Sequence, residues 1–119
     1  MAFARVHLTL ASLAAGFVLA HAAAVANGKA AYVKNGCWQC HGFEGQGSTA
    51  TSGGIVIADT HMPLEAFSAY VRDPRSAMPP YHAEILPDSD LADIYAYLGS
   101  LPKPAPAKDI PLLNNLSAR

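Results

Sequence analysis

Five consecutive residues carry the strongest chemical signal in the sequence: Cys37-Trp38-Gln39-Cys40-His41. Two cysteines three residues apart and followed by a histidine form C-x-x-C-H, the motif to which c-type haem is attached. On one helical turn, residues i, i+3 and i+4 share a face. Both sulfurs can then reach the vinyl groups of one porphyrin, and His41 can direct a ring nitrogen at the iron. The pattern predicts one covalently bound haem c with His41 as a ligand of the iron.

Three other uses of the two cysteines remain open at this point. A thioredoxin-like redox pair also uses C-x-x-C, but it belongs in a βαβ context, which the sequence does not show. A zinc site needs four ligands at short spacings, and downstream of the motif the remaining histidines are His61 and His82, both far away in sequence. A structural disulfide suits an oxidising compartment but leaves the adjacent histidine unexplained. The haem motif accounts for all three residues and is favoured.

An iron held by one histidine needs a sixth ligand or keeps an open site, and four residues are candidates: Met62, Met78, His61 and His82. Met78 is followed by Pro79 and Pro80. Because proline fixes φ, such a loop can hold a thioether against iron without regular structure. Thioether and imidazole form a known axial pair that raises the reduction potential. The sequence favours Met78, the alternative being that both methionines only fill apolar space.

Short helices are the elements that must position these ligands. Helical patterns are expected over three stretches: 27–36, 63–73 and 88–98. In the third, Asp88 and Ser89 are expected to cap the first turn, and one apolar face follows: Leu91, Ile94, Tyr95 and Leu98. Loops are expected over residues 42–54 and 75–86. Because no convincing strand run is present, the sequence predicts an all-α fold.

The first 26 residues have the layout of a secretory signal peptide. A weakly positive start with Arg5 precedes the apolar run Leu8–Ala20, and Ala-x-Ala sites end at Ala22 or Ala26. This pattern predicts cleavage near residues 22–26 and a periplasmic location in a bacterium. The run is short for a membrane span, which needs about 20 apolar residues. A membrane anchor that is never cleaved is the alternative, and after cleavage no span is expected.

Length and composition exclude several other classes of protein. The chain has 119 residues, room for one small domain, with 8 Lys and Arg against 9 Asp and Glu. A nucleic-acid binder is excluded, because no basic stripe exists to neutralise phosphates. Two cysteines are too few for a disulfide-dense scaffold. The core of a mature domain of this size is marginal by itself, and a buried cofactor would enlarge it.

Taken together, these segments resemble a small class I cytochrome c with a single haem. Besides the haem motif and the Met-Pro loop, the resemblance rests on three segments in family order: Gly28-x-x-x-Tyr32, Val71-Arg72-Asp73-Pro74 and residues 91–98. It implies an all-α class I cytochrome c fold, with three to four short helices wrapped around one covalently bound haem. The chain then divides into a signal peptide (residues 1–26), the cytochrome c domain (residues 27–102) and a Pro-rich C-terminal tail (residues 103–119).

The resemblance also implies roles for individual residues. Cys37 and Cys40 would form the thioethers to the haem, and His41 and Met78 would be the two axial ligands of its iron. Two further expectations concern other side chains. Gly28 and Tyr32 should meet Tyr97 where the terminal helices cross, and Arg72 or Tyr81 is a candidate to contact a haem propionate.

The chain departs from the family pattern at one place. Many relatives carry Gly-Pro after the Gly-rich loop, and the carbonyl of that proline accepts the second ring N–H of the haem histidine. Here the matching place is expected at Gly53-Gly54. A glycine carbonyl can still accept this hydrogen bond, but it stands on a less rigid backbone. Such bonds behind a metal ligand tune the metal.

Electron transfer is the function that the resemblance implies. A periplasmic single-haem carrier passes one electron at a time between redox partner proteins by Fe(II)/Fe(III) cycling and is not itself an enzyme. The first alternative is a haem c subunit of a larger dehydrogenase complex. The second is a small haem enzyme, peroxidase-like or oxidase-like, in which Met78 leaves the iron or never binds it. The expected partners are dehydrogenases or oxidases and reductases, with the chain a monomer or a subunit of a complex.

Overall fold

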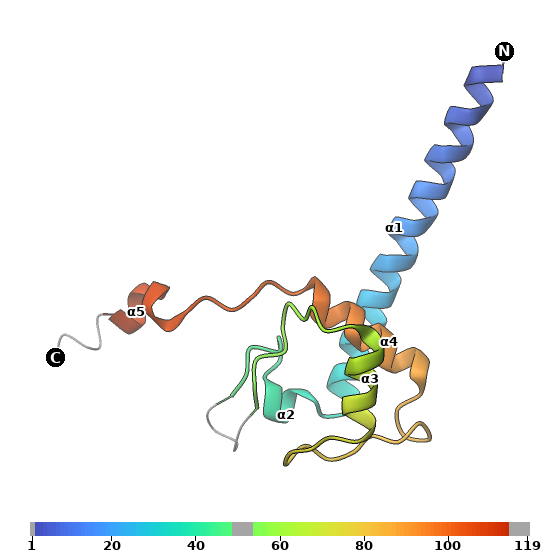
Figure 1. Ribbon diagram of the computed structural model, residues 1–119. Helices are drawn as coiled ribbons and strands as arrows, with labels where there is room; N and C mark the ends of the chain where they lie inside the picture. Colours follow the sequence, from blue (N-terminus) through green and yellow to red (C-terminus); the bar gives the residue numbers. More distant parts are fainter. Residues whose placement is uncertain (1, 49–53, 115–119) are drawn as a thin grey trace.

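Helices and loops make up the part of the chain that the structure, a computed structural model, describes, which is residues 2–48 and 54–114 (Figure 1). The helices in chain order are α1 (Ala2–Lys34), α2 (Trp38–His41), α3 (Leu64–Arg72), α4 (Asp88–Ser100), the 3-10 helix η1 (Ala107–Asp109) and α5 (Pro111–Asn114). Within the described ranges, β pairing is limited to an isolated antiparallel bridge between Ser48 and Gly54. The prediction of an all-α fold is confirmed.

The core forms where the C-terminal part of α1 crosses α4 (Figure 1). Gly28 permits the close crossing, because a Cβ at this position would meet the backbone carbonyl of Asp93. One turn further along α1, Tyr32 is fully buried, and its ring centroid lies 5.6 Å from that of Tyr97 on α4. The expected meeting of Tyr32 with Tyr97 is confirmed, whereas Gly28 lies against the backbone of Asp93 and Ile94.

Apart from Ala58, the buried hydrophobic side chains of the described residues come from α1, α3, α4 and the loop before α4. They form one apolar cluster: Ala31, Tyr32, Val71, Leu86, Leu91, Ile94, Tyr97 and Leu98. The apolar face predicted for α4 is therefore correct at three of its four positions. At the fourth, Tyr97 is buried in place of Tyr95, whose ring is half-buried and packs on Phe67 of α3 at a centroid distance of 5.4 Å.

The helices α3 and α4 agree with the predicted stretches to within two residues, but the predicted cap of α4 is wrong. Pro87 occupies the cap position, and no side chain caps the helix there. The carboxylate of Asp88 instead pairs with Arg72 at the end of α3. At its other end α4 continues through Gly99 to Ser100, so that this glycine lies inside the helix.

The helix α1 is much longer than the predicted stretch 27–36. It runs over 33 residues from Ala2 to Lys34, and its N-terminal part stands away from the rest of the molecule (Figure 1). Alanine is the strongest helix former, and the Ala-rich stretch 20–26 joins the two parts into one helix. Within that stretch, Val25 packs against the core. No helix in the described ranges is long and apolar enough to cross a membrane.

The C-terminal tail leaves the domain after Leu101. Residues 102–106 form neither helix nor strand, and the short helices η1 and α5 follow. Figure 1 shows this segment reaching away from the helical core. Leu112 on α5 is 80% exposed. The last part of the predicted tail, residues 115–119, lies outside the described residues.

Candidate haem site

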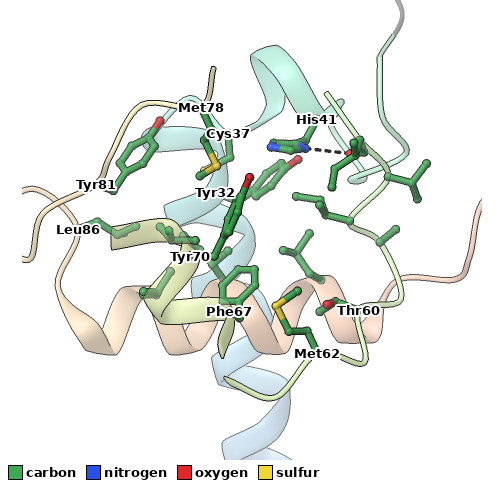
Figure 2. Close-up of a pocket in the computed structure, with 18 of the residues that line it drawn as sticks. Tyr32, Cys37, His41, Thr60, Met62, Phe67, Tyr70, Met78, Tyr81 and Leu86 are labelled. Carbon is green, nitrogen blue, oxygen red and sulfur yellow. Dashed lines mark hydrogen bonds between the residues drawn. The ribbon is translucent and has the colours of Figure 1, made fainter. Parts of the chain in front are cut away.

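A cavity of about 420 Å³ lies between the haem motif, α3, α4 and the loops that join them (Figure 2). This volume is within the range of roughly 300–1,000 Å³ typical of cofactor pockets. Four of the predicted site residues line the cavity: Cys37, His41, Met78 and Tyr81. Most of the remaining lining is aliphatic or aromatic, as an apolar macrocycle requires.

The haem motif forms one helical turn, as its spacing predicts. The backbone N–H of His41 donates to the carbonyl of Cys37 at 3.0 Å, and that of Gly42 donates to the carbonyl of Trp38 at 2.9 Å. Cys37 is half-buried and faces the cavity, whereas Cys40 is exposed and is not among the described residues that line it. The two cysteines are not joined in a disulfide, so the structure does not favour that alternative.

The environment of Cys37 also bears on the other two alternatives for the cysteine pair. Burial raises the pKa of the Cys37 thiol to about 11. A thioredoxin-like pair needs the opposite, a thiol whose pKa is lowered so that the reactive thiolate forms. No cluster of three or more His, Cys, Asp or Glu residues that could hold a metal ion occurs among the described residues. The geometry therefore fits attachment to haem better than redox exchange or zinc binding.

A hydrogen bond to the backbone fixes the orientation of the His41 ring. Its Nδ1 lies 2.9 Å from the carbonyl oxygen of Ile55, the contact drawn as a dashed line in Figure 2. Because a carbonyl can only accept, Nδ1 carries the proton and the lone pair of Nε2 is left to bind a metal. This bond corrects the expected acceptor. Ile55 takes the role assigned to Gly53-Gly54, the carbonyl of Gly54 accepts from Ser48, and Gly53 lies outside the described residues.

Gly54 brings this acceptor into place by its lack of a side chain. A Cβ on Gly54 would meet the carbonyl of Cys40, so the chain passes against the haem motif at a distance that only glycine permits. Ile55 follows directly and presents its carbonyl to His41. The pair that corresponds to the Gly-Pro of the relatives is thus Gly54-Ile55, one residue later than predicted from the sequence.

Two tyrosines hold the loop that follows the haem motif. The hydroxyl of Tyr32 donates to the carbonyl of Gly42 at 2.7 Å, and that of Tyr97 donates to the carbonyl of Phe43 at 3.0 Å. Burial raises the pKa of both phenols, so they remain hydrogen-bond donors at neutral pH. The ring of Trp38 stacks on Phe43 with centroids 4.5 Å apart and is not among the described residues that line the cavity.

The structure reduces the four candidates for the second axial ligand to two. Met62 and Met78 both line the cavity (Figure 2), whereas neither His61 nor His82 is among the described residues that do so. His61 is exposed and pairs with Asp59 at 3.3 Å. Met78 is half-buried, and Met62 is 46% exposed.

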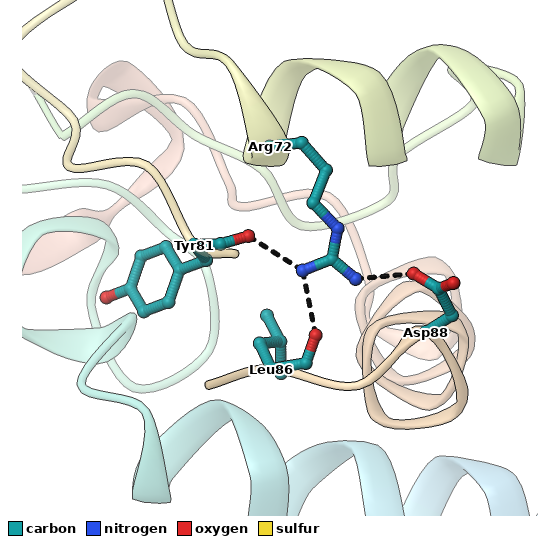
Figure 3. A network of polar contacts seen from close by, with 4 residues as sticks. All are labelled: Arg72, Tyr81, Leu86 and Asp88. Atoms are coloured by element: carbon teal, nitrogen blue, oxygen red, sulfur yellow. Dashed lines mark hydrogen bonds and ion pairs between the residues drawn. The ribbon is translucent and has the colours of Figure 1, made fainter. Parts of the chain in front are cut away.

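The two residues proposed to contact a propionate are placed differently. Tyr81 lines the cavity, and its hydroxyl donates to the carbonyl of Asn35 at 2.9 Å. Arg72 is not among the described lining residues. Its guanidinium donates to the carbonyls of Tyr81 and Leu86 and pairs with Asp88 (Figure 3). A propionate would have to compete with these contacts for the Arg72 guanidinium.

The contacts that depend on backbone atoms or on distant residues could not be predicted from the sequence. No side-chain pattern could identify the carbonyl of Ile55 as the partner of His41. The acceptors of Arg72 are 9 and 14 residues further along the chain, beyond any helical periodicity. The one available signal was Arg72 itself, a cation in the last turn of a helix, directly before the loop of Met78.

A helical domain with a C-x-x-C-H turn, an oriented histidine and a methionine facing one apolar cavity defines a c-type cytochrome. The family model described as "Cytochrome C oxidase, cbb3-type, subunit III" matches residues 23–98, and the chain belongs to this family. The match shows a c-type cytochrome of class I with one haem, so the chain has the class I fold, binds haem c covalently and is a haem-based electron-transfer protein. No curated protein and no solved structure matches the chain.

Proposed function

We propose that the chain is a periplasmic single-haem electron carrier. Cys37 and Cys40 hold the haem by thioether bonds, and His41 and Met78 are the axial ligands. When bound, the haem supplies an iron that changes between Fe(II) and Fe(III) by one electron. The observation that carries the proposal is an apolar cavity that Cys37, His41 and Met78 line together.

His41 is prepared for its role by the bond to Ile55. The carbonyl holds the ring in one orientation and in the tautomer that leaves Nε2 available. A hydrogen bond to the second ring nitrogen also makes the coordinating nitrogen a better donor. The chain therefore offers a strong, preformed ligand on this side of the cavity.

Met78 is a better second ligand than Met62 for two reasons. The Met78 side chain is half-buried, whereas Met62 is 46% exposed. An exposed thioether must compete with water for the axial position on the iron. The chain on both sides of Met78 is also hydrogen-bonded to α3, through Ser76 and Tyr81. With an imidazole in one axial position of the iron and a thioether in the other, no position remains for a substrate. The site therefore favours electron transfer over catalysis.

The apolar lining supports the same conclusion. An apolar surrounding disfavours the additional charge of the ferric state, and a thioether ligand acts in the same direction. Both features raise the reduction potential. Tyr32, Leu91 and Leu98 form part of this lining and are almost fully buried in the core, so it is rigid as well as apolar.

Carbon monoxide binding to the reduced holoprotein tests the proposal against the alternative of a small haem enzyme. A carrier with both axial positions filled should bind carbon monoxide slowly and should be oxidised and reduced reversibly by one electron. Met78→Ala, which opens the position, should bind it much faster and serves as the positive control. Equally fast binding by the unaltered protein and by Met78→Ala would favour the enzyme.

The periplasmic location rests on the composition of the first 26 residues. Their short apolar run and Ala-x-Ala sites are those of an export signal. Expression of the full chain in a bacterium with N-terminal sequencing of the haem protein tests this. A start within residues 23–27 supports export and cleavage, and a haem protein that retains Ala2 or Phe3 supports the uncleaved anchor.

The tail gives specific support to a second candidate, a haem c subunit of a larger redox complex. Residues 102–114 stand away from the domain and include the exposed Leu112 (Figure 1). The matching family is itself described as a subunit of an oxidase. Affinity purification with and without residues 103–119 separates the two functions. A carrier should be isolated alone in both cases, whereas a subunit should bring a membrane oxidoreductase only when the tail is present.

A further inference from the structure

The last turn of α3 holds the loop that carries Met78 at three places. The hydroxyl of Tyr70 donates to Ser76 Oγ at 3.0 Å, before Met78. The carbonyl of Val71 accepts from the backbone N–H of Tyr81 at 3.1 Å, after Met78. The third contact is made by Arg72, the residue that ends the helix. Three consecutive residues of one helical turn thus fix the chain on both sides of the proposed ligand.

Arg72 makes the most extensive of these contacts (Figure 3). Its Nη1 donates to the carbonyls of Tyr81 and Leu86, at 2.7 Å each. Its Nη2 pairs with the carboxylate of Asp88, at the start of α4. The Arg72 side chain is only 22% exposed, and Leu86 is 1% exposed. The guanidinium therefore joins the end of α3, the loop after Met78 and the beginning of α4.

A guanidinium suits this position for a geometric reason. Its planar fork presents several N–H groups in fixed directions, so that one side chain satisfies two carbonyls and a carboxylate together. The ammonium of lysine is a compact point charge and lacks this fork. If Arg72 were replaced, the carbonyls of Tyr81 and Leu86 would lose their partner in a largely buried place, which is costly.

We propose that Arg72 is a positioning residue for Met78, and that its contacts with the carbonyls of Tyr81 and Leu86 set how firmly the thioether binds the haem iron. The proposal rests on the proposed function, because it takes Met78 as the axial ligand. Arg72 itself does not face the cavity. It acts by keeping the chain from Met78 to Leu86 in the one arrangement that points the thioether inward.

Two substitutions of Arg72 and one matched control test this in the intact holoprotein. Arg72→Met removes all the contacts while keeping much of the side-chain volume, and Arg72→Lys keeps the charge without the fork. Asp88→Asn is the control, because it weakens only the ion pair with a carboxylate that is 88% exposed. The readouts are the thioether–iron charge-transfer band of the ferric protein and the rate of carbon monoxide binding to the ferrous protein.

Both Arg72 variants should keep covalent haem but show a weakened charge-transfer band. Their carbon monoxide binding should be faster by about tenfold or more, because the thioether leaves the iron more often. Asp88→Asn should stay within about twofold of the unaltered protein, because the contacts of Nη1 with the two carbonyls remain. A purely structural role would lower the melting temperature without changing either readout.

An unchanged band and an unchanged rate in both Arg72 variants would overturn the proposal. So would equal effects of Asp88→Asn and Arg72→Met, since the ion pair and not the carbonyls would then be responsible. If Arg72→Met does not fold, Arg72→Lys decides on the same two readouts. Absence of the charge-transfer band from the unaltered protein would instead overturn the proposed function, and this inference with it.

Discussion

The two sides of the cavity are held in different ways. On the His41 side, the positioning contacts are made to backbone atoms. The motif closes a helical turn, Gly54 brings the chain into contact with it, and the carbonyl of Ile55 orients the ring. On the Met78 side the chain has no regular structure. Apart from one backbone hydrogen bond between Tyr81 and Val71, side chains from α3, above all Arg72, hold it.

This difference determines how each side can be broken. A site built by close backbone approach fails when a side chain is added, as at Gly54. A loop held by side chains fails when one of them is removed, as at Arg72. The His41 side should therefore be the rigid half of the site. The Met78 side should be the half in which substitutions change ligand binding without loss of the fold.

The largest effect is expected from loss of the haem itself, which removes what both sides enclose. In Cys37→Ser/Cys40→Ser the cavity of about 420 Å³ would have no covalent occupant. The residues around it would lose their packing contacts with the haem, and this loss is large compared with the marginal stability of a small domain. Circular dichroism of the double variant should show loss of most helix. Trp38→Phe, between the two cysteines, should keep both haem and helix.

A methyl group added to the His41 side should have the next largest effect. Gly54→Ala places a Cβ against the Cys40 carbonyl, and because this contact is with backbone it cannot be relieved by a side-chain rotation. The expected destabilisation is about 3 kcal/mol or more. The control is Gly99→Ala inside α4, where the nearest atom to the new Cβ is the Thr60 carbonyl oxygen at 4.0 Å. This control should raise stability by about 0.5–1 kcal/mol in denaturant unfolding. Similar stability of both variants would contradict the inference that the His41 side is the rigid half of the site.

Removal of one hydroxyl from the His41 side should lower stability without loosening Met78. Tyr32→Phe removes one of two donors to the Gly42 carbonyl, which keeps the backbone N–H of Gly45, so the cost is that of one hydrogen bond, about 1 kcal/mol. The rate of carbon monoxide binding should not change, because the contacts of the Met78 loop remain intact. Stopped-flow measurement and thermal unfolding on the same sample check both statements. A faster rate in this variant would show that the two sides are not separate.

The smallest effect is expected at the beginning of the domain, which supports the His41 side through Tyr32. Val25 packs partly against the core, whereas its neighbours Ala23 and Ala26 are exposed. A holoprotein that starts at Ala23 should therefore be more stable than one that starts at Asn27, by about 1 kcal/mol for a half-buried valine. Thermal unfolding of the two forms measures this difference. Equal melting temperatures would show that α1 contributes only from Gly28 onward.

The local features of the fold could be predicted from the sequence, and the long-range ones could not. The C-x-x-C-H spacing defines a turn by itself, and the apolar positions of α3 and α4 repeat with the period of a helix. The continuation of α1 through residues 20–26 was missed, because small residues before a cleavage site are also strong helix formers. Only the folded chain brings the carbonyl of Ile55 to His41.

The same distinction explains the errors at Asp88 and Arg72. A carboxylate before a helical stretch is a good cap by local rules, but here Pro87 occupies the cap position and Arg72 is within reach. The acceptors of Arg72 come together only when the Met78 loop closes onto α3. Local patterns therefore predict which residues belong to the site, and the tertiary structure decides which group each one contacts.

The identity of the second axial ligand is the claim on which this account depends most. The direct test is the ferric absorption spectrum of holoprotein carrying Met78→Leu, with Met62→Leu as its matched control, since both changes nearly conserve side-chain volume. If Met78 is the ligand, the thioether–iron charge-transfer band should disappear in Met78→Leu and be unchanged in Met62→Leu. Loss of the band in Met62→Leu, with retention in Met78→Leu, would contradict it.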